Sequence, residues 1–156
     1  MTDTESRQHV ITEARSWIGT PYNINQCVKG VGVDCARLLV GVYAACELIP
    51  AEDLGIFSDD WFCNISEDVY MRRVLRHARK ILESVCYRNL AAIGPGDIVL
   101  TKAAHSKVFN HGAIVVKWPT VIHAIQPVVQ EIDVTQSPLW AVRDITVFTL
   151  WGDRAR

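Results

Sequence analysis

The spacing of apolar residues predicts two helices in the first third of the chain. The first extends from a cap at Asp3-Thr4 to about Ile18, and its apolar residues fall on one face at helical spacing: Val10, Ile11, Ala14, Trp17 and Ile18. A second stretch, Cys35 to about Leu48, is apolar nearly all round, so we expect a buried central helix. Asp34 is a good N-cap for it. The intervening residues 22–33 are rich in turn formers and predict a loop.

The pattern changes after the middle of the chain. Ser66 to about Val85 predicts a third helix, one face of which is basic. After Tyr87, short runs rich in β-branched residues follow a Pro95-Gly96-Asp97 turn and predict strands. These runs are Ile98–Thr101, Gly112–Lys117, Val121–Ala124, Val128–Val134 and Ile145–Trp151. Strands that follow one another without helices favour an antiparallel sheet, so we expect one α+β domain over residues 1–156.

Charge and composition argue against some classes of function. The formal net charge is -1, which argues against bulk electrostatic binding to nucleic acid. The longest uncharged apolar run, Leu38 to Cys46, is about half of the roughly 20 residues that a membrane helix needs. The first residues show no apolar core of a secretory signal. We therefore expect no membrane insertion and a protein that is cytoplasmic at synthesis.

Cys35 is the candidate nucleophile among five cysteines. None of the five forms a C-x-x-C pair and no histidines have zinc-finger spacing, so we expect no structural zinc site. Nucleophilic catalysis by a cysteine needs no metal or organic cofactor, and we expect none. Cys35 lies at the predicted first turn of a helix, where the dipole and free N–H groups lower a thiol pKa and stabilise an oxyanion. Position alone fits a buried core cysteine equally well.

Two histidines are candidate partners of that thiol. His111 begins one predicted strand and His123 lies in the next, with a turn at residues 118–120 between them. If these strands pair as a hairpin, the two rings lie close together on one face. His105, in a polar stretch, is the next candidate for a base, while His9 and His77 read as surface residues.

Five segments in order resemble one known family. They are Gly19-Thr20-Pro21-Tyr22, Gly30-x-Gly32-x-Asp34-Cys35, Pro95 to Leu100, His111 to Val115, and Ile122-His123-Ala124. This series resembles the NlpC-type cell-wall peptidases, which are papain-like cysteine enzymes, and it extends from about Ala14 to Trp151. Val28 to Gly32 and Asp60-Trp61 are most similar to the subgroup encoded with phage-tail or gene-transfer-agent genes.

The resemblance implies a role for each matching residue. Cys35 would be the nucleophile, His111 the general base and His123 the residue that orients it. Tyr22 would help the Cys35 backbone N–H bind the oxyanion, and Asp34 would contact the amino end of the substrate. The implied fold is a small papain-like α+β domain, and the implied reaction is hydrolysis of the D-glutamyl–diamino acid bond in peptidoglycan stem peptides. Phage-tail proteins are implied partners, and a phage-tail-like particle the implied route to the cell wall.

One departure concerns substrate preference. The family usually has Asp-Cys-Ser-Gly at the nucleophile, whereas this chain has Asp34-Cys35-Ala36-Arg37. Alanine lacks a hydroxyl that can hold a peptide amino terminus, and arginine adds a large cation. This departure leaves open an acyltransferase or deamidase acting on a protein. A separate alternative, from another class of function, is a phage-tail structural or assembly component without turnover.

Overall fold

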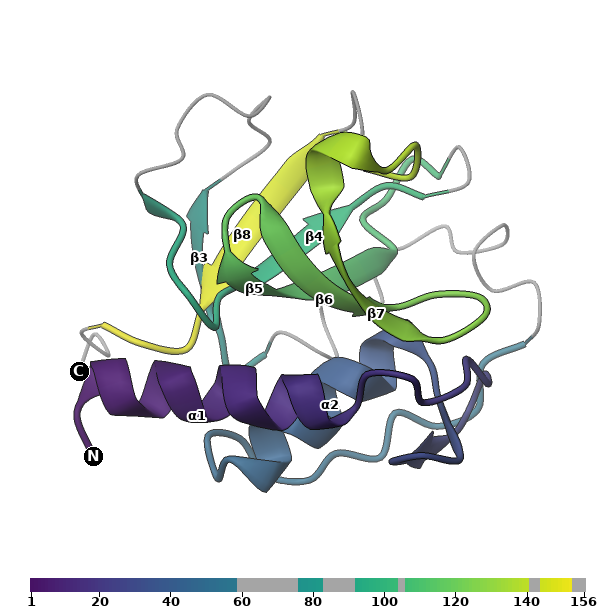
Figure 1. The fold of residues 1–156 in the computed structure, drawn as a ribbon, viewed down its shortest axis with the longest axis horizontal. Coiled ribbons are helices and arrows are strands. Elements are labelled where there is room, and N and C mark those ends of the chain that lie inside the picture. Colours follow the sequence, from purple (N-terminus) through teal and green to yellow (C-terminus); the bar gives the residue numbers. More distant parts are fainter. Residues whose placement is uncertain (59–75, 83–91, 104–105, 141–143, 153–156) are drawn as a thin grey trace.

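The computed structural model describes residues 1–58, 76–82, 92–103, 106–140 and 144–152. Within these ranges two α-helices, α1 (Asp3–Ser16) and α2 (Cys35–Ala45), lie against one curved sheet (Figure 1). The sheet strands are β3 (Arg79–Leu82), β4 (Ile98–Thr101), β5 (His111–Lys117), β6 (Thr120–Ala124), β7 (Val129–Asp133) and β8 (Ile145–Thr149). A short hairpin of β1 (Cys27–Val28) and β2 (Gly32–Val33) precedes α2, and a 3-10 turn, η2 (Val134–Gln136), follows β7.

The described sheet strands are antiparallel throughout, in the order β3-β8-β4-β5-β6-β7. Alternate residues of each strand enter two separate apolar clusters. Ile98, Leu100 and Ile114 pack toward the helices, whereas Val99, Ala113 and Val115 pack with Trp140. Both faces of the central strands are therefore buried, and the predicted α+β class is confirmed.

Helix α2 packs against α1 and against strands β5 and β6 of the sheet, as its continuous apolar pattern predicts. All of its first six residues are buried. Gly41 allows a close approach, because a Cβ atom there would stand 3.0 Å from Cys27 Sγ and 3.1 Å from the Trp17 ring. The tight packing of α1 and of β1 on α2 holds the start of α2 in place.

Arg7 joins the first helix to the far end of the chain. Its guanidinium donates to Asp97 Oδ1 at 2.9 Å and to Thr149 Oγ1 at 3.3 Å, and it lies 4.2 Å from the centre of a Trp151 ring. The Trp151 indole N–H also donates to Ser6 Oγ at 3.1 Å. These contacts fasten α1 to β8 and to the turn before β4.

The predicted third helix is wrong over its last part. Arg79–Leu82 forms strand β3, which pairs antiparallel with β8, so no helix extends from Ser66 to Val85. An otherwise open edge of β8 supplies backbone partners for these residues, and this long-range pairing outweighs a local helical pattern. His77 is not on a helix but in the turn before β3, 3.0 Å from Glu52. The earlier part of the predicted helix, 66–75, lies outside the described residues.

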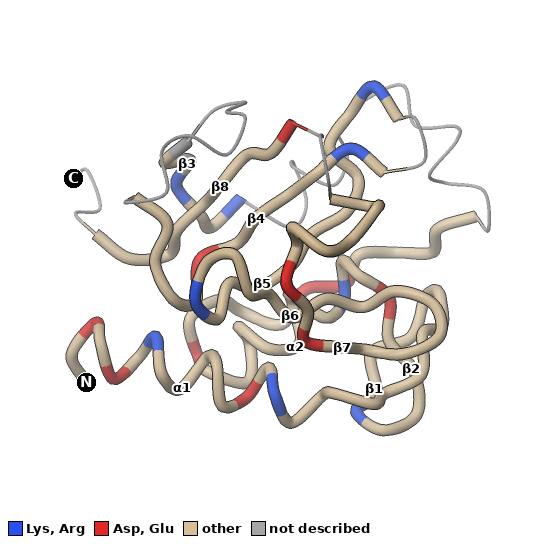
Figure 2. The backbone as a smooth tube through the Cα atoms, turned by 45° about the horizontal axis from the view of Figure 1, so that its top comes forward, with Lys and Arg blue, Asp and Glu red and all other residues tan. Residues whose placement is uncertain are grey.

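The other predicted elements match closely. β4 has the predicted bounds, and β5 and β6 each begin one residue earlier than predicted. β7 is one residue shorter than predicted at each end, and β8 ends at Thr149 rather than Trp151. The segment 22–33, predicted as loop, contains the small β1–β2 hairpin. Figure 2 shows Lys and Arg interspersed with Asp and Glu along the described backbone, with no long stretch of one sign. Neither described helix has the length and apolarity required to cross a membrane.

Candidate active site

The candidate nucleophile lies where a strand turns directly into a helix. Asp34 is the N-cap of α2, and its Oδ1 accepts a hydrogen bond from the Arg37 backbone N–H at 2.9 Å. β2 ends one residue earlier, and Val33 bridges to Tyr22 as well as pairing with Cys27. Cys35 is thereby fixed at the first position of the helix, as the sequence predicts, and it is fully buried.

The two histidines meet on neighbouring strands, as expected from their spacing. His111 begins β5 and His123 lies in β6, and both are buried. His111 Nε2 lies 2.9 Å from His123 Nδ1, with the ring planes at 77°. Trp140 packs against both rings, at centroid distances of 5.5 and 6.1 Å. The indole therefore contributes to the burial of both imidazoles.

Cys35 lies against the start of the histidine strand. The backbone N–H of Gly112, the residue after His111, acts on the Cys35 thiol together with the N–H groups of Ala36 and Cys35 itself. The Tyr22 phenol is also close enough for its pKa to respond to Cys35 and Asp34. The fold therefore places Cys35, Asp34 and Tyr22 close together, with the thiol against Gly112, the neighbour of His111 in β5.

Burial sets the protonation of this site, and the direction for the thiol differs from the sequence-based expectation. Burial raises the pKa of Cys35, and the neighbouring Asp34 carboxylate raises it further, which outweighs the opposing backbone N–H groups. The N–H groups at the helix start do lower the pKa of Cys35, as expected, but the net shift is upward because desolvation of the thiolate is the larger effect.

The imidazoles are shifted toward their neutral forms. Burial, and then the neighbouring His123, lower the pKa of His111 well below its usual value. Burial also lowers the pKa of His123 to about 4. Burial therefore favours the neutral form of both imidazoles, as it favours the neutral thiol of Cys35. Burial likewise raises the pKa of Tyr22, so its phenol keeps a proton to donate.

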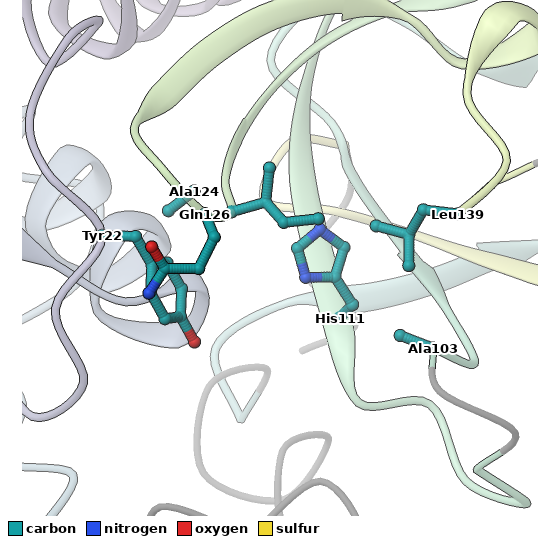
Figure 3. Close-up of a pocket in the computed structure, with 7 residues that line it drawn as sticks. Tyr22, Ala103, His111, Ala124, Gln126 and Leu139 are labelled. Carbon is teal, nitrogen blue, oxygen red and sulfur yellow. The ribbon is translucent and has the colours of Figure 1, made fainter.

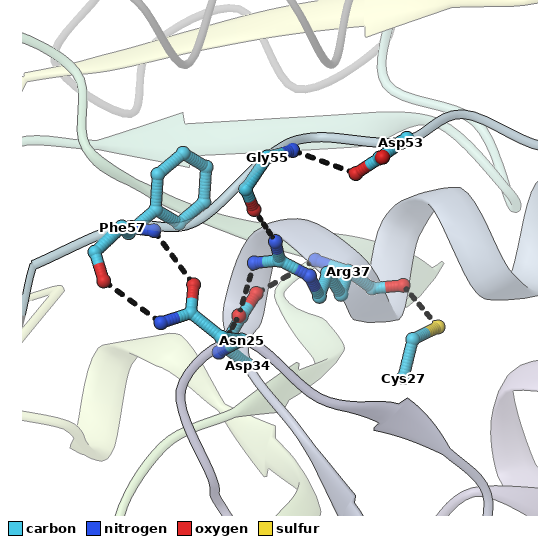
Figure 4. Close-up of polar contacts among 7 residues, drawn as sticks. All are labelled: Asn25, Cys27, Asp34, Arg37, Asp53, Gly55 and Phe57. Atoms are coloured by element: carbon cyan, nitrogen blue, oxygen red, sulfur yellow. Dashed lines mark hydrogen bonds and ion pairs between the residues drawn. The ribbon is translucent and has the colours of Figure 1, made fainter.

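The Asp34 carboxylate is engaged within the protein (Figure 4). Its Oδ2 accepts from Arg37 Nη1 at 2.7 Å and from the Asn25 backbone N–H at 2.8 Å, and the residue is 1% exposed. The contact of Asp34 with a substrate amine stays a prediction, and it requires this pairing to open.

Arg37 and Asn25 extend this pairing to a latch over the segment 53–57. Arg37 Nη2 donates to the Gly55 carbonyl oxygen, and its guanidinium lies 4.9 Å from the Phe57 ring centre. Asn25 bonds both backbone groups of Phe57, at 2.7 and 2.8 Å. Because these partners lie far apart in sequence, only the unusual arginine after the nucleophile gave a signal of the latch.

A small cavity opens beside His111 (Figure 3). Tyr22 and Gln126 lie on one side of the imidazole, and Leu139 and Ala103 lie on the other. Sequence analysis missed Leu139 and the Trp140 indole, whose positions depend on the turn after β7. Gln130, also missed, places its amide nitrogen 3.5 Å from His123 Nε2; its position seven residues after His123, in the next strand, was the available signal.

Two expectations concern residues outside the described ranges. His105 and Asp60-Trp61 lie in segments about which the structure gives no placement. In the part of the chain that is described, no three histidine, cysteine or acidic side chains gather as a metal site would require.

No protein-family model and no curated protein sequence matches the chain. Solved structures do share its fold. The NlpC/p60 domain of the peptidoglycan hydrolase SagA aligns with a TM-score of 0.54 at 22% identity, over 90% of this chain and 97% of that one. A Staphylococcus aureus protein of the NLP/P60 family, similar to lipoprotein, gives a TM-score of 0.64 at 18% identity, over 97% of this chain and 43% of that one. NlpC1 from Trichomonas vaginalis gives 0.65 at 15% identity, over 98% and 46%. The chain therefore has the small papain-like α+β fold of NlpC/p60 proteins.

Proposed function

We propose that the chain is a cysteine hydrolase that cleaves an amide bond in peptidoglycan stem peptides. Cys35 is the nucleophile, His111 the general base and His123 the positioning residue. The observation that carries this proposal is the meeting of the buried Cys35 thiol with the start of β5, where His111 contacts His123 at 2.9 Å. The substrate class is supported by the SagA domain of the same fold, which belongs to a peptidoglycan hydrolase.

The first half of the reaction forms an acyl-enzyme. His111 donates its Nε2–H to His123 and so keeps Nδ1 as a base. It takes the thiol proton of Cys35 as the sulfur attacks the amide carbonyl, and the new oxyanion is held by the Cys35 backbone N–H and the Tyr22 phenol. The C–N bond then breaks, and the amine leaves with the proton from the His111 imidazolium.

The second half releases the acid. His111 removes a proton from water, the hydroxide oxygen attacks the thioester, and the sulfur leaves and regains the proton. A neutral resting pair suits this sequence, because charge separates only when the carbonyl is present to accept electrons from sulfur.

Digestion of purified muropeptides, with products identified by mass, tests the proposal. The wild-type protein should release fragments cut at one amide, for which we propose the D-glutamyl–diamino acid bond. Cys35→Ser should release none at a comparable rate, while Cys27→Ser should match wild type. Intact muropeptides after exposure to the folded wild-type protein would refute the assignment.

The role of His123 is tested by comparing variants that keep a hydrogen-bonding side chain with one that removes it. His123→Gln and His123→Asn should keep measurable activity, because an amide can accept from the His111 Nε2–H. His123→Ala should lose much more. Equal losses in all three variants would exclude a positioning role through that hydrogen bond.

Acyl transfer is the second candidate, because Ala36 and Arg37 replace the usual residues after the nucleophile. An amine acceptor that attacks the acyl-enzyme instead of water would give a new amide. Mass spectrometry of reactions with and without added amines separates the two outcomes. We also propose that a phage-tail-like particle carries the chain to the cell wall, as the resemblance of the segments around Val28 and Asp60 implies. Detection of the chain in purified particles would test this proposal.

A further inference from the structure

The cavity beside His111 has walls from five separate parts of the fold. Ala103 follows β4, Ala124 ends β6, Leu139 follows η2, and Tyr22 precedes the β1–β2 hairpin. Its volume is about 210 Å³. An apolar protein cavity of about 150 Å³ can hold a benzene ring, so this space fits one branched aliphatic or aromatic group rather than a whole ligand.

The described lining carries no formal charge. Ala103, Ala124, Ile125 and Leu139 supply aliphatic surface, and Gln126 at the rim is neutral. His111 is neutral at physiological pH because burial and His123 lower its pKa. A cationic or anionic group entering here would lose water and gain no ionic partner among these residues.

The Asp34 carboxylate, next to the nucleophile, does not supply the negative charge that the cavity lining lacks. Asp34 is 1% exposed, and its oxygens accept from Arg37 and Asn25. The positive charge of Arg37 neutralises it at 2.7 Å, within a side-chain pair that is 10% and 1% exposed. An ammonium group near the scissile bond therefore finds no free carboxylate at this point of the site.

We propose that this cavity is a substrate subsite that selects an uncharged, apolar group next to the scissile amide. That the bound group belongs to a substrate rests on the proposed function. The preference for an uncharged, apolar group is a property of the cavity itself. It makes the chain selective for an amide flanked by an aliphatic or aromatic substituent, with charged groups of the same substrate directed away from His111.

Three probes of nearly equal shape test the preference: isobutyramide (neutral), isobutyrate (anionic) and isobutyramidine (cationic). Chemical shifts of the labelled methyl groups of Ala103, Ala124, Ile125 and Leu139 in the full chain report binding at the cavity. We expect saturable shifts with isobutyramide and at least about tenfold weaker binding of both ions, because neither recovers its lost hydration.

A matched pair of variants provides the control. Gln126→Glu puts a carboxylate at the exposed rim and should improve isobutyramidine binding several-fold relative to isobutyramide. Gln8→Glu makes the same change on the exposed surface of α1 and should leave the ratio unchanged. Equal binding of the three probes, no methyl shifts with isobutyramide, or the same response in both variants would overturn the subsite. Muropeptide digestion is scored separately, so loss of the proposed function leaves this result readable.

Discussion

The thiol side and the histidine side of the candidate site are buried by different means. Around Asp34, burial is polar. The carboxylate accepts from the Arg37 guanidinium and the Asn25 backbone N–H, and the side chains of Arg37 and Asn25 bond the backbone of Gly55 and Phe57. Around His111, burial is apolar, with Trp140 against both imidazoles. The comparison shows that one desolvated pocket can keep acid and base neutral from opposite directions, raising the thiol pKa while lowering those of the imidazoles.

The largest expected effect is on the histidine side. His111→Ala should lower the rate of muropeptide cleavage by about 10²–10⁴-fold, since general-base catalysis contributes that much. Circular dichroism should show an unchanged fold. His9→Ala, an exposed histidine on α1, is the matched control and should cleave at the wild-type rate. A near-normal rate in His111→Ala would transfer the role of base to another group, with His105 the first to test.

The polar side should be broken most severely by removing its cation. Arg37→Ala leaves the buried Asp34 carboxylate without its partner, which typically costs about 3–5 kcal/mol of the free energy of unfolding. Arg15→Ala removes an ion pair with Glu131 whose side chains are 49% and 27% exposed, and should cost no more than about 1 kcal/mol. Urea denaturation measures both. Similar losses in the two variants would show that the latch contributes no more than a surface pair.

Lowering the pH should destabilise the histidine side. The pKa of His123 is about 4 in the folded chain against an ordinary value of 6.5, so the unfolded chain binds more protons between these values. Stability therefore falls as pH drops from about 6.5 to about 4, by roughly 3 kcal/mol from His123 alone. His111 acts in the same direction. His123→Gln should flatten the pH dependence measured by denaturation, and an unchanged slope in that variant would contradict the assignment.

The smallest expected effect is on the thiol side and concerns the alkylation rate of Cys35. At pH 6–7 iodoacetamide should alkylate Cys35 at least about tenfold more slowly than Cys27, because Cys35 is fully buried and its thiolate is disfavoured, whereas Cys27 is exposed. Peptide mapping by mass spectrometry gives both rates in one sample. Faster labelling of Cys35 would mean that the free enzyme already holds an ion pair.

Local pattern was enough where burial and pairing follow from neighbouring residues. Ile98–Thr101 alternates between the two cores, and His111 and His123 flank a short turn, so their strands and their meeting were predictable. Arg79–Leu82 forms a strand because it pairs with β8, which is 60 or more residues away in sequence. A local pattern of apolar residues cannot predict such a pairing. The predicted direction of the Cys35 pKa shift was wrong for a similar reason. The sequence shows that Cys35 begins a helix, but not that the fold buries its thiol away from water.

The contacts of Arg7 and Ser6 with Asp97 and Trp151 also set an order for folding during synthesis. The first helix leaves the ribosome early, but its partners in β8 and the preceding turns emerge more than 80 residues later. Until then α1 can pack on α2 and β5, but the polar contacts that fasten its first turns are missing. A chain stalled before β8 should therefore leave the start of α1 open to proteases, and release of the last strand should be the step that closes the molecule.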